Sequence, residues 1–293
     1  MKVILATSAA LGALMVGGCA DSASATVHMS GAGAYSSADG QHVYDQDGDV
    51  SLMGSDMSVS GRIGGALSLI GSDLDVDADI GEGMSLVGSD ITFSGSVGGN
   101  TSIAGSDVEW AGTSGGSVEI AGSDIEWSGS ADDGLAIAGS DVGIDGRIGE
   151  DVDIAGSDVE LSQATNVGGD LSIAGSDLII HGTIGGNADL VGNSIEMDGR
   201  IEGRLLAVAF SRSGWSWTTD NSHHRIRING AVGEGSAVCA RRVEIGPEAD
   251  ISGTLAVFAE DPPVFTDGAT QADVNFEEIG DRDCDDLLEP YDR

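Results

Sequence analysis

The chain has 293 residues, enough for one large domain or two ordinary ones, and 47 of them are glycine. Acidic residues number 49 and basic residues 12, and the formal net charge of −37 makes a polymer that repels phosphate, which excludes nucleic acid as a partner. No internal segment has the roughly 18 consecutive apolar residues of a membrane-spanning helix.

The N-terminus has the pattern of an export signal. A positive charge at Lys2 is followed by an apolar stretch, and Gly17-Gly18 precede Cys19. A charged start, an apolar stretch and small residues before a cleavage point are typical of a secretory signal, which we assign to residues 1–18. The small residues before Cys19 are similar to the lipobox of bacterial lipoproteins, so we expect Cys19 to carry a lipid; a plain cleaved signal is the alternative.

The likeness to lipoproteins implies a location. Several acyl chains on one residue anchor a protein stably in a lipid membrane. Ala20 follows the cysteine, as in the lipoproteins that are sorted to the outer membrane. We therefore expect an exported lipoprotein, in the outer membrane or facing the periplasm, that contacts the membrane through Cys19. Residues 19–48 begin with a stretch rich in Ser, Ala and Gly and are predicted to be a lipidated tether and N-terminal cap.

A 17-residue repeat organises the middle of the chain. Gly-Ser-Asp recurs every 17 residues from Gly54 to Gly156, returns at Gly175 after 19 residues, and is followed 17 residues later by a variant at Gly192. A fixed period in this range is typical of a solenoid. Apolar residues occupy the second position before each motif glycine and the third and fifth positions after it, with polar residues between them. This alternation predicts strands with one buried face.

Glycines mark three corners in each period. Gly-Ser-Asp is the first, a glycine such as Gly61 or Gly146 is the second, and pairs such as Gly64-Gly65 are the third. Glycine adopts positive φ without steric cost, and Asp suits turns because its side chain bonds to nearby backbone. We therefore predict an all-β fold over residues 49–276, a three-sided β-helix with three strands per coil. About 12 coils stacked roughly 4.8 Å apart give a rod roughly 60 Å long.

Two tryptophans test which side chains point inward. Trp110 and Trp127 occupy one column in adjacent coils, and the third side of the same coils carries Ser114 and Ala131 in place of Ile or Val. Large residues matched by small ones are typical of a close-packed interior. We expect both tryptophans in the core rather than on a surface that stacks against sugars.

The aspartates of the Gly-Ser-Asp motifs are the first candidate site. In stacked coils these carboxylates form a ladder, with neighbours roughly 5 Å apart, and hydrogen bonds, salt or cations must offset their repulsion. Each Asp is either a turn residue that accepts backbone N–H groups or part of a weak row of Ca²⁺ sites, because Ca²⁺ prefers carboxylate and carbonyl oxygens. Ca²⁺ is the one cofactor that the sequence suggests. The ladder consists of Asp56, Asp73, Asp90, Asp107, Asp124, Asp141, Asp158 and Asp177.

An insertion at residues 211–222 interrupts the period and is the second candidate site. Long loops of solenoids often carry function, and a solvated surface loop is the alternative. Nearby arginines suit an anionic partner such as an envelope polysaccharide, a lipid headgroup or a protein. Two adjacent histidines without a third ligand are a weak metal signal. The candidate partner-binding residues are Trp215, Trp217, Asp220, His223, His224, Arg225 and Arg227.

Other features favour a protein without enzymatic activity. The sequence shows no nucleophile–base pair, and its Gly-Gly pairs are assigned to corners rather than to a phosphate-binding loop. Extending the inward column through the insertion places Cys239 in the core, which leaves open both a buried thiol and a disulfide with Cys284. Residues 277–293 form an acidic C-terminal tail.

Three short stretches resemble the bactofilins: residues 144–149, residues 180–187, and residues 255–276 with Asp267-Gly268-Ala269. The resemblance covers roughly residues 49–276. It implies a right-handed, three-sided β-helix of a family that polymerises end to end without nucleotide and helps to shape the cell envelope. The export signal, the Gly-Ser-Asp column and the insertion at 211–222 depart from the pattern of that family.

We therefore expect a non-enzymatic structural or scaffolding lipoprotein of the bacterial cell envelope. Hydrophobic coil ends would then serve as assembly surfaces, with self-polymerisation as one option. The alternative is a surface adhesin, or a glycan- or ion-binding module, that uses residues 211–228.

Overall fold

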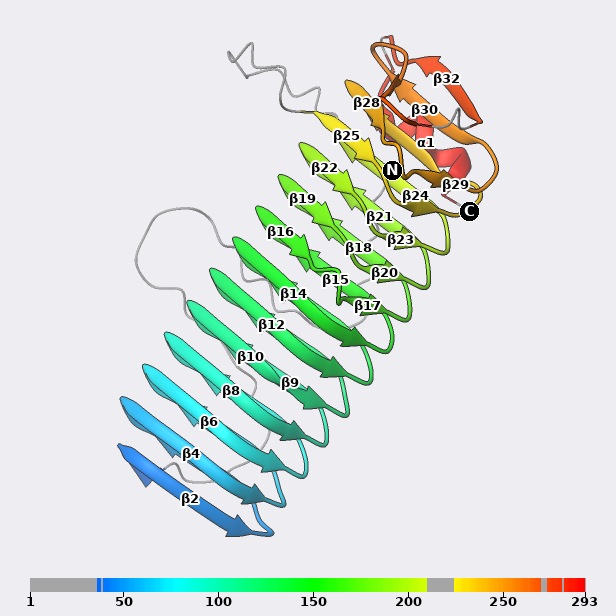
Figure 1. Cartoon of the computed structure of the whole chain (residues 1–293). Helices are drawn as coiled ribbons and strands as arrows, with labels where there is room; N and C mark the ends of the chain where they lie inside the picture. The colour runs from blue at the N-terminus through cyan, green and yellow to red at the C-terminus, as the bar shows by residue number, and fades with distance from the viewer. Residues whose placement is uncertain (1–35, 38, 210–223, 270–272, 281, 293) are drawn as a thin grey trace, which may run out of the picture.

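A computed structural model of the chain describes residues 36–37, 39–209, 224–269, 273–280 and 282–292, with side chains from residue 39 onward. It is nearly all β, with 60% strand and 3% helix. Parallel strands form a solenoid of about 13 turns with about 17 residues per coil. Figure 1 shows one elongated stack whose coils wind in the right-handed sense as the chain rises from β2 towards β28. The predicted fold class is confirmed.

One side of every coil belongs to a 14-stranded parallel sheet, which we call sheet A. In the regular coils its strands are short because each ends just before the glycine of the Gly-Ser-Asp corner or of its variant at Gly192. Sheet A consists of β1 (Ser36–Ser37), β3 (Val50–Met53), β5 (Leu67–Ile70), β7 (Met84–Val87), β9 (Thr101–Ala104), β11 (Val118–Ala121), β13 (Leu135–Ala138), β15 (Val152–Ala155), β18 (Leu171–Ala174), β21 (Ala188–Val191), β24 (Leu205–Ala209), β27 (Ala237–Ala240), β30 (Leu255–Ala259) and β32 (Val274–Glu278).

The other two sides form sheet B, whose strands begin at the motif aspartate in the regular coils. In the first coils, a single strand covers both sides: β2 (Gly40–Gln46), β4 (Asp56–Ile63), β6 (Asp73–Ile80), β8 (Asp90–Val97), β10 (Asp107–Ser114), β12 (Asp124–Ala131) and β14 (Asp141–Ile148). Later coils divide it: β16 (Asp158–Leu161) and β17 (Asn166–Val167), β19 (Asp177–Ile180) and β20 (Thr183–Ile184), β22 (Ser194–Met197) and β23 (Arg200–Ile201), β25 (Arg225–Ile228) and β26 (Ala231–Val232), β28 (Arg242–Ile245) and β29 (Asp250–Ile251). The last member is β31 (Val264–Phe265).

The expectation of three strands per coil is therefore wrong for the first coils. Glycines with positive φ, such as Gly129 at 134° and Gly146 at 136°, let one strand turn the second corner without leaving its hydrogen-bonded ladder. The division begins in the 19-residue period. There, a turn separates β16 from β17, and the Thr165 N–H group closes it by donating to the Ser162 carbonyl at 3.1 Å.

Alternate side chains of all three sides fill one continuous apolar core. Trp110 and Trp127 are 0% and 1% exposed, so the prediction that they are core residues is confirmed. They are register partners, as are Ser114 and Ala131 on the third side of the same coils. The rings of Trp110 and Phe93 stack with their centroids 4.3 Å apart. Small residues opposite the tryptophans provide the space that these rings need.

The acidic C-terminal segment is docked on the solenoid rather than extending from it. Helix α1 (Cys284–Leu288) and the 3-10 turn η1 (Glu289–Tyr291) follow the last strand. Leu287 and Leu288 are buried in a second apolar cluster, outside the main core, with outward side chains of the last strands of sheet A such as Phe258. Arg204 also pairs with Asp292 at 3.1 Å.

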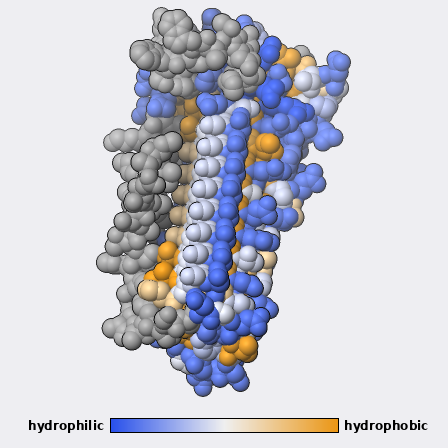
Figure 2. All heavy atoms as spheres, turned by 90° about the vertical axis from the view of Figure 1, so that its left-hand side faces the viewer, coloured by the Kyte–Doolittle hydropathy of each residue, from blue (hydrophilic) through white to orange (hydrophobic). Residues whose placement is uncertain are grey.

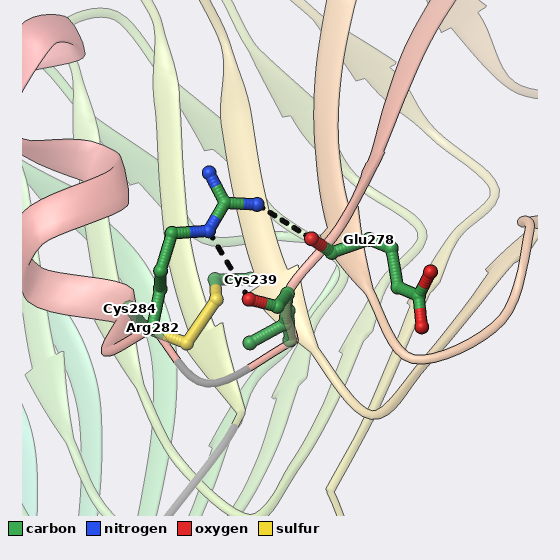
Figure 3. The surroundings of a disulfide bond; sticks show 5 residues. Cys239, Glu278, Arg282 and Cys284 are labelled. Atoms are coloured by element: carbon green, nitrogen blue, oxygen red, sulfur yellow. Dashed lines mark hydrogen bonds between the residues drawn. A yellow bond between two sulfur atoms is a disulfide. The ribbon is translucent and has the colours of Figure 1, made fainter.

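A disulfide joins this segment to the solenoid (Figure 3). Cys239 of β27 is bonded to Cys284 of α1, with an S–S distance of 2.05 Å. Cys239 partners Val208 in the outward column, and Val238 takes the inward position. The inward placement of Cys239 is therefore wrong: Val238, one residue earlier, partners the inward Ala207, and a difference of one residue exchanges the two faces of a strand. Arg282 donates to the carbonyls of Glu278 and Ile279 beside the bond.

The second corner gives the first prediction. A Cβ at Gly129 would overlap the Gly112 carbonyl oxygen, and the φ of +134° at Gly129 is unfavourable for any other residue. We expect Gly129→Ala to destabilise the protein by at least about 1–3 kcal/mol, the usual cost of such backbone strain. Thermal unfolding followed by circular dichroism measures this. Gly48→Ala is the matched control, because no atom lies within 4 Å of the position that its Cβ would take; equal Tm values for the two variants would contradict the corner assignment.

The disulfide between Cys239 and Cys284 gives the second prediction. We expect Cys239→Ser with Cys284→Ser to release α1 while the solenoid stays folded, because the cluster under α1 is separate from the main core. Binding of an apolar dye should then increase, and trypsin should cleave at Arg282 faster. Loss of a native disulfide costs about 2–4 kcal/mol, which here falls on the docked segment. Cys19→Ser serves as the control, and unchanged cleavage at Arg282 would show that the bond does not hold α1.

Candidate functional site

The eight motif aspartates form the predicted ladder. Each is the register partner of the next, from Asp56 with Asp73 to Asp158 with Asp177. Backbone hydrogen bonds hold the corner: the N–H groups of Ser72 and Asp73 both donate to the Ser55 carbonyl at 2.9 Å, and the same pattern recurs in the following coils. Figure 2 shows a straight hydrophilic column beside a paler one along this edge.

The carboxylates of the ladder do not have the turn role that the sequence suggests. Among the described residues, no backbone N–H group donates to any of them, since the corner donors are already bonded to backbone carbonyls. All eight side chains are exposed. Their surroundings are solvent and the neighbouring carboxylates.

That turn role belongs instead to a second ladder at the third corner, which the sequence reasoning missed. Its members accept a backbone N–H group from the next coil at 2.7–3.2 Å. The signal is present in the sequence as an Asn or Asp shortly after a corner glycine, as in Gly98-Gly99-Asn100. The ladder consists of Asp49, Asn100, Asp151, Asp170 and Asn187.

Stacking changes the acidity of the exposed ladder. Every second carboxyl group in its regular part has a pKa raised above its ordinary value. The largest cause is a hydrogen bond with the carboxyl group of the preceding coil, and repulsion by the neighbouring carboxylates acts in the same direction. The carboxyl groups with raised pKa values therefore keep a proton to higher pH than an isolated aspartate does. The affected residues are Asp73, Asp107 and Asp141.

Shallow grooves run beside the ladder, one at Asp56–Asp90 and one at Asp124–Asp177. Within the described ranges, no group of three or more His, Cys, Asp or Glu side chains is arranged to hold a metal ion. The Ca²⁺ row stays a prediction. What the geometry provides is a straight line of negative charge, which concentrates cations along the edge by long-range attraction.

The ladder reverses its charge at the C-terminal end. Asp177 is followed in the same column by Ser194, Arg225 and Arg242. Among the described residues neither arginine has an acidic partner, whereas Arg227 is paired with Glu196. Insertion 211–222 lies between β24 and β25, so it replaces the Gly-Ser-Asp corner at the point where the arginines begin.

The predicted partner-binding residues are only partly described. His224 adopts a φ of 66° and its N–H group donates to the Asn193 carbonyl. Arg225 and Arg227 lie in β25, two residues apart on its outward face. Four further candidates lie outside the described residues, as do Cys19 and the predicted signal. These four are Trp215, Trp217, Asp220 and His223.

Comparison of the chain with models of protein families, with curated proteins and with solved structures finds no match. In the described part of the chain, α1 and η1 are both too short to cross a membrane.

The raised pKa values predict a pH dependence. Between the ordinary value of 3.8 and the raised values, the folded protein binds more protons than the unfolded chain. The contribution of these groups to the free energy of unfolding therefore increases as the pH falls from neutral through the raised pKa values towards 3.8. We expect the triple variant Asp73→Asn, Asp107→Asn, Asp141→Asn to have a higher Tm than the native protein at pH 7. The difference should narrow as the pH approaches 4.

Asp145→Asn is the matched control, because its register partner in the preceding coil is Ser128 rather than an acid. Its Tm should follow that of the native protein across the same pH range. A triple variant that is less stable at neutral pH would show that the carboxylates stabilise the corner instead of repelling one another.

Proposed function

We propose that the protein is a non-enzymatic structural rod of the bacterial cell envelope, exported and anchored through a lipid on Cys19. The observation that carries the proposal is the single stack of about 13 coils around one core. At roughly 4.8 Å per coil the rod is roughly 60 Å long. Each coil is hydrogen-bonded to the next on every side, and such a rod suits a spacer or scaffold.

The two ends of the rod differ in polarity. In the first coil, His42 lies at the inward position over Val59, and Gln46 lies over Ile63. Polar residues at inward positions are typical of a terminal coil that closes the core against water. The expectation of hydrophobic surfaces at both ends therefore does not apply to the N-terminal end.

The C-terminal end is more apolar. Val264 and Phe265 of β31 are 44% and 36% exposed, and Val274 and Phe276 of β32 are only partly buried. These strands are the last of their sheets, so their free backbone groups point along the rod axis, and Phe265, Val274 and Phe276 continue inward columns to the end of the core. Two copies that meet through this end would cover both, in a symmetric contact. We propose that self-association occurs here, and that longer polymers need a further contact.

A second candidate function rests on the arginines of the ladder. Arg225 and Arg242 stack in adjacent coils beside the insertion, in a chain that is otherwise strongly acidic. A pair of guanidinium groups at this spacing suits the carboxylate or sulfate groups of an acidic polysaccharide. This supports an adhesin or glycan-binding module that uses residues 211–228. Replacing Arg225 and Arg242 by alanine should abolish glycan binding if this function is correct and should leave self-association unchanged.

The rod proposal is tested by sedimentation velocity and electron microscopy of the purified full chain. We expect the protein to associate with itself in a concentration-dependent way. Phe265→Asp should weaken this association at least tenfold, because a charge at the centre of an apolar contact opposes the contact. Val43→Asp is the matched control, since Val43 is 81% exposed at the opposite end of the rod. Monomers at every concentration would refute self-association.

A further inference from the structure

The outer face of sheet A carries an apolar column along most of the rod. Its members occupy the last position of consecutive strands and are register partners. On one side of the column lie the motif glycines, which have no side chains, and on the other lies a column of mostly Ser, Asp and Glu. We call this column the apolar stripe: Met53, Ile70, Val87, Ala104, Ala121, Ala138, Ala155, Ala174 and Val191.

The C-terminal continuation of the apolar stripe is already covered by the chain itself. Val191 is followed in the same column by Val208, Cys239 and Phe258, which are buried under α1. Among the described elements, only α1 and its neighbour η1 pack on this face. Met53, at the other end, is 46% exposed. The described chain therefore covers the outer face of sheet A at its C-terminal end, and the apolar stripe continues the same column towards the N-terminal end.

The chain before β1 has the pattern and the starting point to cover the rest. β1 lies next to β3 in sheet A, with Ser36 opposite Leu52 and Ser37 opposite Met53, so the chain that precedes β1 starts within one strand of the first member of the apolar stripe. In this segment apolar residues alternate with polar ones, which gives an extended chain one apolar face. Residues 20–35 include one acid and no Lys or Arg, so the acidic rod repels them little. The alternating apolar residues are Ala23, Ala25, Val27 and Met29.

The lengths agree. Residues 20–30, fully extended at roughly 3.3 Å each, span roughly 36 Å, and the eight steps between the nine members of the stripe span roughly 38 Å. Gly31 and Gly33 lie between this stretch and β1, and their conformational freedom would allow a strap to change direction there. Five consecutive alanines make the middle of the stripe a smooth row, which accepts side chains at any spacing.

We propose that residues 20–30 dock lengthwise on the apolar stripe as an intramolecular strap. The strap would replace the free tether that the sequence suggests for this region. It would bring Cys19 alongside the C-terminal half of the rod, near α1. A lipid on Cys19 would then hold the rod along a membrane surface instead of at the end of a loose linker. The proposal does not depend on self-association of the rod.

A second copy of the chain fits the stripe less well. A face roughly 38 Å long and roughly 10 Å wide buries roughly 400 Å² per partner, about half of what a stable protein interface buries. Two chains that each carry a net charge of −37 also repel one another. The strap avoids both penalties, because it is nearly neutral and already attached.

Crosslinking of the full chain tests the strap. Cys19→Ser removes the competing thiol, and Val27→Cys is paired with Val87→Cys on the stripe. The matched control pairs Val27→Cys with Ser96→Cys, which lies in the same stretch of coils on another side of the rod. With a short bismaleimide, we expect the intramolecular crosslink to form at least tenfold faster in the stripe pair, as measured by peptide mass spectrometry.

Two further variants test whether the rate of the intramolecular crosslink depends on the apolar face of the strap. Ala25→Asp with Met29→Asp should remove the tenfold preference, whereas Ser24→Asp with Thr26→Asp, which adds the same charge to the polar face, should keep it. Circular dichroism checks that the solenoid stays folded in each variant. Equal rates for the two cysteine pairs would overturn the proposal, and crosslinks found only between molecules would show that a second copy occupies the stripe instead.

Discussion

Parallel stacking in register is the constraint on which the rest of the structure depends. Each coil donates and accepts backbone hydrogen bonds with the coils on either side, so a residue meets its equivalent from the neighbouring period. The inward columns then need only approximate complementarity, because a bulky residue in one column is offset by a small one in another, as Trp110 and Ser114 show. A register that differed by one residue would exchange the buried and exposed faces, as the neighbours Val238 (inward) and Cys239 (outward) illustrate.

The same stacking has a consequence for charge. A repeated acid necessarily lies on another acid, and the raised pKa values of alternate aspartates follow from that contact. Acids at the third corner behave differently, because their oxygens accept backbone N–H groups from the next coil. One residue type thus has two roles, a stabilising one where backbone donors are free and an electrostatic one where they are already bonded.

Where the repeat ends or is interrupted, the rod acquires individual surfaces. The N-terminal coil is closed by polar inward residues, and the C-terminal coil leaves Val264 and Phe265 partly exposed. The insertion replaces one corner at the point where the column changes from aspartate to arginine. On sheet A, the segment that carries α1 covers one end of the outer face. The proposed self-association and glycan-binding surfaces lie at these departures, whereas the proposed strap uses an outward column that the regular coils repeat.

The sequence by itself determined the period, the inward columns, the Gly-Ser-Asp ladder and the burial of both tryptophans, because each follows from local alternation repeated at a constant interval. Tertiary structure decided the rest. A bend at a positive-φ glycine merges two predicted strands into one, since the ladder continues through it. The disulfide, the docking of α1 and the difference between the two ends depend on which residues meet across an interrupted repeat. No periodicity extends through such an interruption, so only the assembled chain shows which face each residue takes.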